Sequence, residues 1–449
     1  MKEFKYILIH HISREEKMRK KVIAYSVILV FLSLGLLFSQ EREGQKIVLS
    51  EVIQKALKEN PKVKAAEEEW RAALEKVPQA KSLPDPMLRY SFFGQRVETR
   101  LGPQRNKFSL SQKFPFFGKL SLKGEIAQSH ASMLEEKVGA VKADIELKVK
   151  KAFFSLYWLD YAMKISQEEK EVLKRLARIA GIKYETGTSS QQDVLKAQLE
   201  ISKVLDKILT LRQMRKSAAA GLNSLLNRHP DVYLGEVEEY KIPEFQYELE
   251  DLYRLAKKYR PELKKIQRLI EKNEKGLKLA KKNYYPDFQV MLDYIDIGGG
   301  TTTHPEDGRN AWMASIGVNI PLWKKKLQAA EAEQAVKIKA SEASYRNAEN
   351  ETLSSVNEFF FEVKTAKEQI ELYEYSLLPQ AEQTFKASEI GYLAGKVDFL
   401  NLLESERMVL MIKTGYHKAV SHFGISLAQL ERAVGRNLII NKERRRSNE

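Results

Sequence analysis

The chain has 449 residues, of which 30% are charged and 43% are apolar, and its formal net charge is +15. Lysine and arginine are interleaved with glutamate and aspartate along most of the chain, which indicates solvated helix faces rather than a nucleic-acid surface. The chain contains no cysteine, which excludes disulfides, thiolate chemistry and lipid attachment through an N-terminal cysteine. Its length predicts either two domains or an extended architecture.

Residues 1–40 are predicted to be a signal peptide preceded by an extension. The basic stretch MRKK begins at Met18, and an apolar run follows over residues 22–38. This run lies at the lower length limit for a membrane-spanning helix, so an uncleaved anchor is the alternative. With either assignment, the chain after Gln40 is exported.

The remainder of the chain is predicted to be one unit of about 200 residues written twice. The segment that begins at Leu49 aligns with the segment that begins at Leu249. Further on, YETGTSSQQDVLKAQ from Tyr184 aligns without a gap with YLAGKVDFLNLLESE from Tyr392. The predicted division is repeat 1 over 41–229, a linker over 230–248, repeat 2 over 249–436 and a polar tail over 437–449.

Each repeat is predicted to contain a helix, two strands and a long helical hairpin, in that order. Pro78 is the first of three prolines expected to end the opening helix of repeat 1. In DFQVMLDY, alternation places Phe288, Val290 and Leu292 on one face, as in a half-apolar strand. The predicted strands cover about 87–93, 107–114, 287–294 and 311–320.

The hairpins are predicted from stretches of strong helix formers with almost no proline. A helix that begins near Lys119 and ends before the first turn has about 65 residues and a length of about 97 Å. Gly187 supplies the helix-ending conformation, and Ser189 or Ser190 caps the returning helix. The hairpin tips are predicted at about 184–192 and 392–400.

The alternating strands fit a membrane β-barrel, because the chain is exported and aromatic residues lie near the strand ends. A small soluble sheet that caps a coiled coil is the alternative. Four strands cannot close a barrel, whereas a trimer supplies twelve. No catalytic constellation is found among the scattered histidines and abundant carboxylates, so we expect no enzymatic activity, no cofactor and no metal site.

The sequence resembles the TolC-like outer-membrane efflux proteins over roughly residues 47–436. The resemblance lies in the tandem repeat, in SQKFPFFGKL and in the paired turns YETGTSSQQDVLKAQ and YLAGKVDFLNLLESER. The motifs FPFFGKL and GKVDFLNLLESER are more similar to the heavy-metal efflux branch than to the multidrug branch.

This resemblance implies a mainly α-helical homotrimer whose 12-stranded β-barrel lies in outer-membrane lipid and continues as a helical tunnel across the periplasm. It implies a passive duct of a tripartite efflux or type I secretion system for drugs, metal ions or other small molecules. The implied partners are a periplasmic adaptor (membrane fusion) protein and an inner-membrane pump of the RND or ABC type. A periplasmic coiled-coil adaptor or scaffold, or an N-terminally anchored helical sensor, is the alternative.

The resemblance also implies which residues act at the tips. In the family, an acidic pair in the second tip rings the pore constriction; here the matching positions hold an amide and one acid. The residues implied at the constriction are Glu404, Asn401 and Asp398. The residues implied in tip contacts or adaptor docking are Tyr184, Gly187, Thr188, Asp193, Tyr392, Gly395 and Lys396. Three Glu404 side chains are expected to converge on the threefold axis; an ordinary exposed Glu404 is the alternative.

Overall fold

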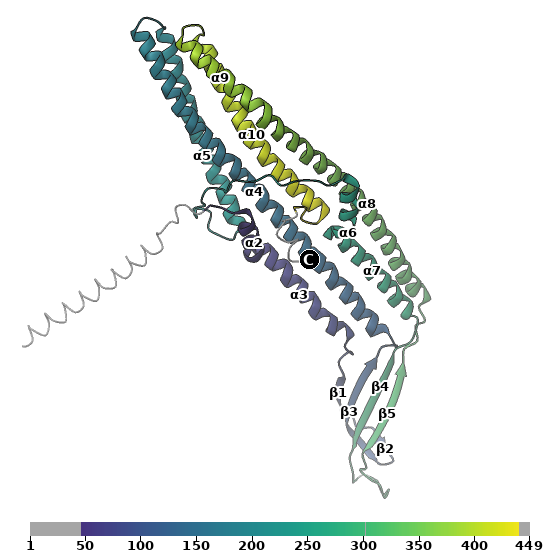
Figure 1. The fold of residues 1–449 in the computed structure, drawn as a ribbon. Helices are drawn as coiled ribbons and strands as arrows, with labels where there is room; N and C mark the ends of the chain where they lie inside the picture. The colour runs from purple at the N-terminus through teal and green to yellow at the C-terminus, as the bar shows by residue number, and fades with distance from the viewer. Residues whose placement is uncertain (1–45, 301, 440–449) are drawn as a thin grey trace, which may run out of the picture.

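A computed structural model describes residues 46–300 and 302–439 as a long rod of helices with a small sheet at one end (Figure 1). The two helical hairpin tips lie at the opposite end of the rod. The predicted signal peptide and its extension, and residues 440–449 of the predicted tail, lie outside the described residues. None of the helices described is both long enough and apolar enough to cross a membrane.

Each repeat opens with two consecutive helices that are separated by a single residue. That residue is Asn60 in the first repeat and Arg260 in the second, and both have extended backbones. A proline follows each of them, and a proline disfavours helical geometry in the residue before it. The helices are α2 (Leu49–Glu59) and α3 (Pro61–Lys81), then α6 (Leu249–Tyr259) and α7 (Pro261–Lys282).

Pro78 does not end the opening helix, contrary to the prediction from sequence. It lies inside α3, which continues to Lys81. The Pro78 carbonyl accepts hydrogen bonds from the backbone N–H of Ser82 at 3.1 Å and from its hydroxyl at 2.8 Å. Ser82 therefore completes the final turn of α3, although Pro78 has no backbone N–H to donate.

Two long helical hairpins run along the rod. The turn before Pro379 is π-helical, since the proline has no N–H to donate and the helix widens by one residue there. In the first hairpin, α4 (Lys119–Glu185) returns as α5 (Gln191–Leu225). In the second, α8 (Lys324–Leu372), η1 (Tyr373–Leu377) and α9 (Leu378–Leu393) form one rod that returns as α10 (Phe399–Val434).

The sheet is antiparallel, with the strand order β1-β3-β4-β5. Its strands are β1 (Met87–Phe92), β3 (Gly102–Phe114), β4 (Phe288–Ile297) and β5 (Ala311–Val318). A further short strand, β2 (Glu98–Thr99), pairs with the start of β3. β3 therefore begins five residues before the predicted position 107, because its first residues have a strand partner.

The largest core lies halfway along the rod, where α2, α6 and the 230–248 linker cover the long helices. Phe153, Phe154, Leu222, Leu252 and Phe423 are almost fully buried there. A smaller core lies behind the tips and joins the two hairpins. These cores fix the second hairpin against the first, chiefly through contact of α10 with α4.

Candidate functional site at the hairpin tips

The first tip closes through a left-handed glycine. Gly187 has φ of +73°, a conformation that costs glycine little and other residues more. The backbone N–H groups of Thr188 and Ser189 both donate to the Lys183 carbonyl, at 2.8 and 3.1 Å. These bonds satisfy the carbonyl end of α4 in the way expected of a glycine C-terminal motif. Gly187 therefore has the helix-ending role predicted from the sequence.

Asp193 organises the start of the returning helix. Ser190 occupies the N-cap of α5, one of the two predicted positions, but its side chain caps no backbone N–H. Instead, the Asp193 carboxylate accepts hydrogen bonds from the Ser189 hydroxyl at 2.5 Å and from the Ser190 hydroxyl at 3.4 Å. Ser190 is therefore the N-cap residue, but its hydroxyl donates to Asp193 instead of accepting a backbone N–H.

The second tip has the same backbone and a different cap. Gly395 has φ of +72°, and the N–H groups of Lys396 and Val397 donate to the carbonyl of Gly391 at 2.8 and 3.2 Å. The N-cap of α10 is Asp398. Its carboxylate accepts one hydrogen bond from the Asn401 backbone N–H at 2.8 Å and another from the Asn401 amide at 3.0 Å.

Asp398, Asn401 and Glu404 form an exposed stripe on α10. They are three residues apart, which places them on neighbouring turns of one helix face. The opposite face carries the buried Phe399 and Leu402. The three residues named for the constriction are therefore brought together, although one acid already serves as a helix cap.

Glu404 remains open to solvent within this chain. Its side chain is 71% exposed, and the nearest cation recorded for it is Arg407, at 3.8 Å. The guanidinium of Arg407 lies closer to Glu200 of α5, at 2.5 Å. Arg407 thus links the two hairpins and neutralises Glu404 only weakly.

Tyr392 is buried where the two hairpins meet. Its ring packs against Phe399, with the ring centroids 5.3 Å apart. Lys183 of the first hairpin donates to the Tyr392 carbonyl at 2.5 Å and lies 4.7 Å from the centroid of its ring. Burial raises the pKa of the Tyr392 hydroxyl, and the nearby Asp193 carboxylate raises it further. This residue therefore joins one tip to the other.

The remaining predicted contact residues lie on the outside of the tips. Tyr184, which aligns with Tyr392 in the repeat, is 47% exposed. Thr188 and Lys396 are exposed as well. The Thr188 hydroxyl donates to the Lys183 carbonyl at 3.0 Å, a bond within its own turn. Docking of a partner by these side chains stays a prediction.

The sequence analysis missed a buried acid, Glu406, behind the second tip. It is 3% exposed and lies near Glu169 of α4, and burial together with the charge of Glu169 raises its pKa to about 8. Burial also raises the pKa of Glu169, although Lys207 lies 3.3 Å from its carboxylate. The available signal was spacing, because Glu406 falls on the apolar stripe between Phe399 and Val409.

Elsewhere on the rod, the buried His417 is used in packing. His417 stacks on Tyr161, with ring centroids 3.9 Å apart, and burial lowers the pKa of His417 to about 4. The Tyr157 hydroxyl lies 3.1 Å from Nδ1 of this imidazole. Among the residues that the structure describes, no three His, Asp or Glu side chains are placed to hold a metal ion together.

The sheet has one apolar face and one polar face. On the polar face, Lys107 pairs with the buried Asp293 at 3.1 Å. The apolar face is exposed within this chain and carries cross-strand pairs such as Tyr90 with Phe108 and Leu292 with Ala314. Its exposed large side chains include Leu88, Tyr90, Phe92, Phe108, Leu110, Phe114, Val290, Leu292, Tyr294, Trp312, Ile316 and Val318.

Comparison with known families gives one match that covers both repeats. The family model described as "Outer membrane efflux protein" matches residues 52–228 and again residues 252–436. The two matched segments coincide closely with the two repeats found in the sequence.

Individual proteins are also similar over nearly the whole chain. The cobalt-zinc-cadmium resistance protein CzcC of Cupriavidus metallidurans is 24% identical over 440 residues, which are 93% of this chain and 100% of CzcC. The outer-membrane channel OprN is 16% identical with a TM-score of 0.72, covering 87% of this chain and 91% of OprN. The outer membrane protein VceC of Vibrio cholerae is 17% identical with a TM-score of 0.71, covering 87% and 96%.

Proposed function

This chain belongs to the outer membrane efflux protein family, and we propose that three copies form a passive duct for cations that a pump delivers from the periplasmic side. The fold is that of the TolC-like channels, which lie in the outer membrane and extend into the periplasm. The proposal adds the subunit number, the class of cargo, the partners and the roles of the tip residues.

The observation that carries the proposal is the two-faced sheet at one end of a long helical rod. Its apolar face exposes large side chains in register, and its polar face bears Lys107 and Asp293. β1 and β5 are the open edges of the sheet, and such edges are not tolerated in lipid. Pairing β5 of one copy with β1 of the next would close twelve strands, with apolar side chains facing lipid and polar side chains lining the lumen.

We propose divalent heavy-metal cations as the cargo. The curated relative CzcC is a cobalt-zinc-cadmium resistance protein, and its similarity spans 93% of this chain. The exposed stripe on α10 presents the carboxylate of Glu404 with little compensating charge. Three such stripes around a threefold axis would attract cations and repel anions.

The two tips have different roles in this proposal. The first tip braces the second, because Lys183 bonds the Tyr392 carbonyl and Arg175 of α4 pairs with Glu389 of α9 at 3.0 Å. The second tip carries Glu404 on its open face. An adaptor protein and an inner-membrane pump would dock at the tip end and separate the hairpins.

The proposal is tested by single-channel conductance of the purified trimer in a planar bilayer. We expect a conducting pore that favours cations in the wild type and loses much of this preference in Glu404→Gln. Asp231→Asn, which removes an acid from the exposed linker, is the matched control and should leave the preference unchanged. A purified trimer that does not conduct would contradict the duct, whereas unchanged selectivity in Glu404→Gln would contradict only the role of Glu404.

The alternatives drawn from the sequence predict other locations. A coiled-coil adaptor or scaffold would be recovered outside the outer-membrane fraction. An anchored sensor would retain residues 22–38 in the mature protein. Recovery of a trimer from the outer membrane, with an N-terminus beyond residue 38, would exclude both.

A further inference from the structure

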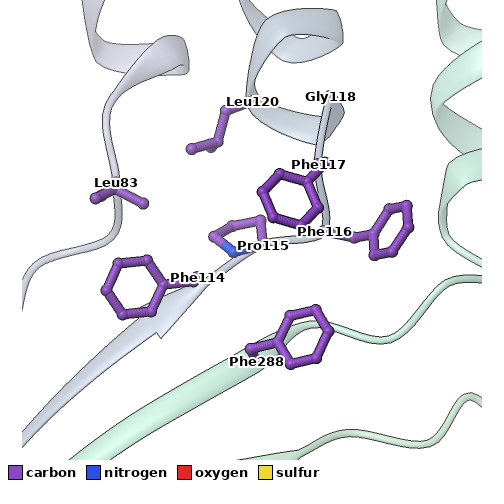
Figure 2. A pocket seen from close by; sticks show the side chains of 8 residues that line it. All are labelled: Leu83, Phe114, Pro115, Phe116, Phe117, Gly118, Leu120 and Phe288. Carbon is purple, nitrogen blue, oxygen red and sulfur yellow. The ribbon is translucent and has the colours of Figure 1, made fainter.

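An apolar cavity of about 440 Å³ lies where the sheet joins the helices. Figure 2 shows side chains from three separated parts of the chain around it, including Leu83 before β1, Leu120 at the start of α4 and Phe288 at the start of β4. Nothing ionisable lines it among the described residues. Its lining residues are Leu83, Phe114, Pro115, Phe116, Phe117, Gly118, Leu120 and Phe288.

This cavity continues the apolar face of the sheet. Phe114 at the end of β3 pairs directly with Phe288, and Leu110 pairs with Leu292 further along the same two strands. Alternation places these four side chains on one face. Phe117, three residues after the end of β3, is 81% exposed within the chain. The cavity therefore opens toward the surface that the proposed barrel turns to lipid.

A second cavity, of about 550 Å³, lies between α4 and α7 and is basic. It is lined by the three lysines Lys278, Lys281 and Lys282, and by one carboxylate, Glu125, whose oxygen accepts from the Ser121 hydroxyl at 3.2 Å. Lys281 also pairs with Glu331 of α8 at 3.8 Å. Three lysines therefore face two carboxylates, which leaves a net positive charge at the cavity. Both cavities lie in the size range of ligand sites in proteins.

The two cavities meet at Gly118, which lines both. Lys282 stands at this boundary, since its ammonium group lies 3.3 Å from the Phe117 carbonyl and 5.6 Å from the centroid of the Phe116 ring. Gly118 has φ of +84°, and a Cβ there would come within 3.5 Å of the Lys282 ammonium. An apolar space and a cationic space thus share one glycine-lined boundary.

This junction is also held rigidly. The Phe116 ring stacks on Tyr285 with centroids 4.7 Å apart. Asp287 accepts a hydrogen bond from the Phe116 backbone N–H at 3.0 Å and another from the Lys119 ammonium at 2.7 Å. The start of α4 is therefore fastened to the start of β4, and both cavities are formed in advance of any ligand.

We propose that this junction binds an anionic glycerophospholipid of the periplasmic leaflet, with an acyl chain in the apolar cavity and the phosphate beside Lys278, Lys281 and Lys282. The inference rests on the proposed function, because it needs the apolar sheet face to be in lipid. The junction would lie at the periplasmic boundary of the membrane, because the long helices start at this end of the sheet. Basic pockets next to apolar surface at a membrane boundary suit anionic headgroups.

The test is native mass spectrometry of the intact, delipidated trimer after addition of phosphatidylglycerol, phosphatidylethanolamine or glycerol phosphate. We expect up to one phosphatidylglycerol per chain, bound at least about tenfold more tightly than phosphatidylethanolamine, because three lysines attract the anionic headgroup. Glycerol phosphate has no acyl chain and should not be retained. Equal retention of glycerol phosphate would show a phosphate site and overturn the proposal.

Two variants separate the two halves of the site. Lys278→Gln/Lys281→Gln/Lys282→Gln should abolish the preference for phosphatidylglycerol, and Leu120→Trp, which fills the apolar cavity, should reduce retention of both lipids. Lys258→Gln/Lys264→Gln/Lys265→Gln removes the same charge where α6 ends and α7 begins, and should behave as the wild type. Loss of preference in this control, or its persistence in the first variant, would overturn the proposal.

Photo-crosslinking of the wild type tests the site without relying on a variant that could fail to assemble. Phosphatidylglycerol with a photoreactive acyl chain should label the peptide that contains Phe117, and labelling confined to other peptides would overturn the proposal. Conductance is measured on the same trimer. A conducting trimer without bound phosphatidylglycerol contradicts only the lipid site, and a lipid-bound trimer that does not conduct contradicts only the duct.

Discussion

The two hairpin tips share a backbone and differ in the bonds that hold it. Gly187 and Gly395 have almost the same φ, +73° and +72°. Where the first tip has Ser190 followed by Asp193, the second has Asp398 followed by Asn401, so the acid moves from the first turn to the N-cap. The duplicated fold therefore keeps the backbone of the turn, whereas the side chains of the two turns make different hydrogen bonds.

The largest expected difference concerns the paired tyrosines. Tyr392→Ala should cost about 3 kcal/mol of local stability, the usual cost of truncating a buried aromatic side chain. Tyr184→Ala should cost less than about 1 kcal/mol, because its ring is half exposed. Hydrogen exchange of the tip amides measures both. Equal costs would contradict the different burial of the two tyrosines and would place Tyr184 in a contact between subunits.

The second prediction concerns Glu406, whose aligned residue in the first repeat is the exposed Gln198. Because the pKa of Glu406 is raised from 4.5 to about 8, the folded protein holds this proton more tightly than the unfolded chain does. Its stabilising contribution is complete below pH 4.5 and is lost as the pH rises through about 8. Glu406→Gln keeps the neutral form and should be more thermostable than the wild type above pH 8.

The measurement is the midpoint of thermal unfolding between pH 5 and pH 9. Glu171→Gln is the control, since Glu171 is exposed and paired with Lys174 on α4. The difference between Glu406→Gln and the wild type should grow toward alkaline pH. A constant difference across this range would show that the Glu406 carboxyl does not titrate there.

The smallest expected effect separates the two caps. Asp398→Ala should destabilise the start of α10 by about 1 kcal/mol, because it removes the acceptor of the Asn401 backbone N–H. Ser190→Ala should cost less than about half of that, because the Ser190 hydroxyl caps no backbone N–H. Amide exchange in the first turn of each helix reports both values. The reverse order would mean that the caps had been assigned to the wrong residues.

Much of the architecture was predictable because its signals are local. The turn at Gly187 follows from a glycine between helix formers, and the sheet from alternation such as Phe288, Val290 and Leu292. The gapless alignment of the two tips indicated the duplication. Pro78 was misread because a proline near the end of a helix removes one donor without breaking the last turn, and Ser82 completes that turn.

The candidate site was predicted less completely. The positions of Asp398, Asn401 and Glu404 on one face follow from their spacing of three. That Asp398 caps a helix while Glu404 stays open does not follow from spacing, since both are acids in the same tip. Glu406 was overlooked because an acid in a highly charged helix is usually exposed.

The repeat could be recognised by aligning the sequence with itself. The helical hairpins, the strand alternation and the chemistry of the turns follow from residues that are close together in the chain. The tertiary structure alone decided which of two aligned tyrosines is buried, which acid is desolvated and where apolar and basic cavities meet. Those outcomes depend on how α10 packs on α4 and how α7 packs beside α4. Burial is a property of the neighbours, and aligned residues in a duplicated chain do not have the same neighbours.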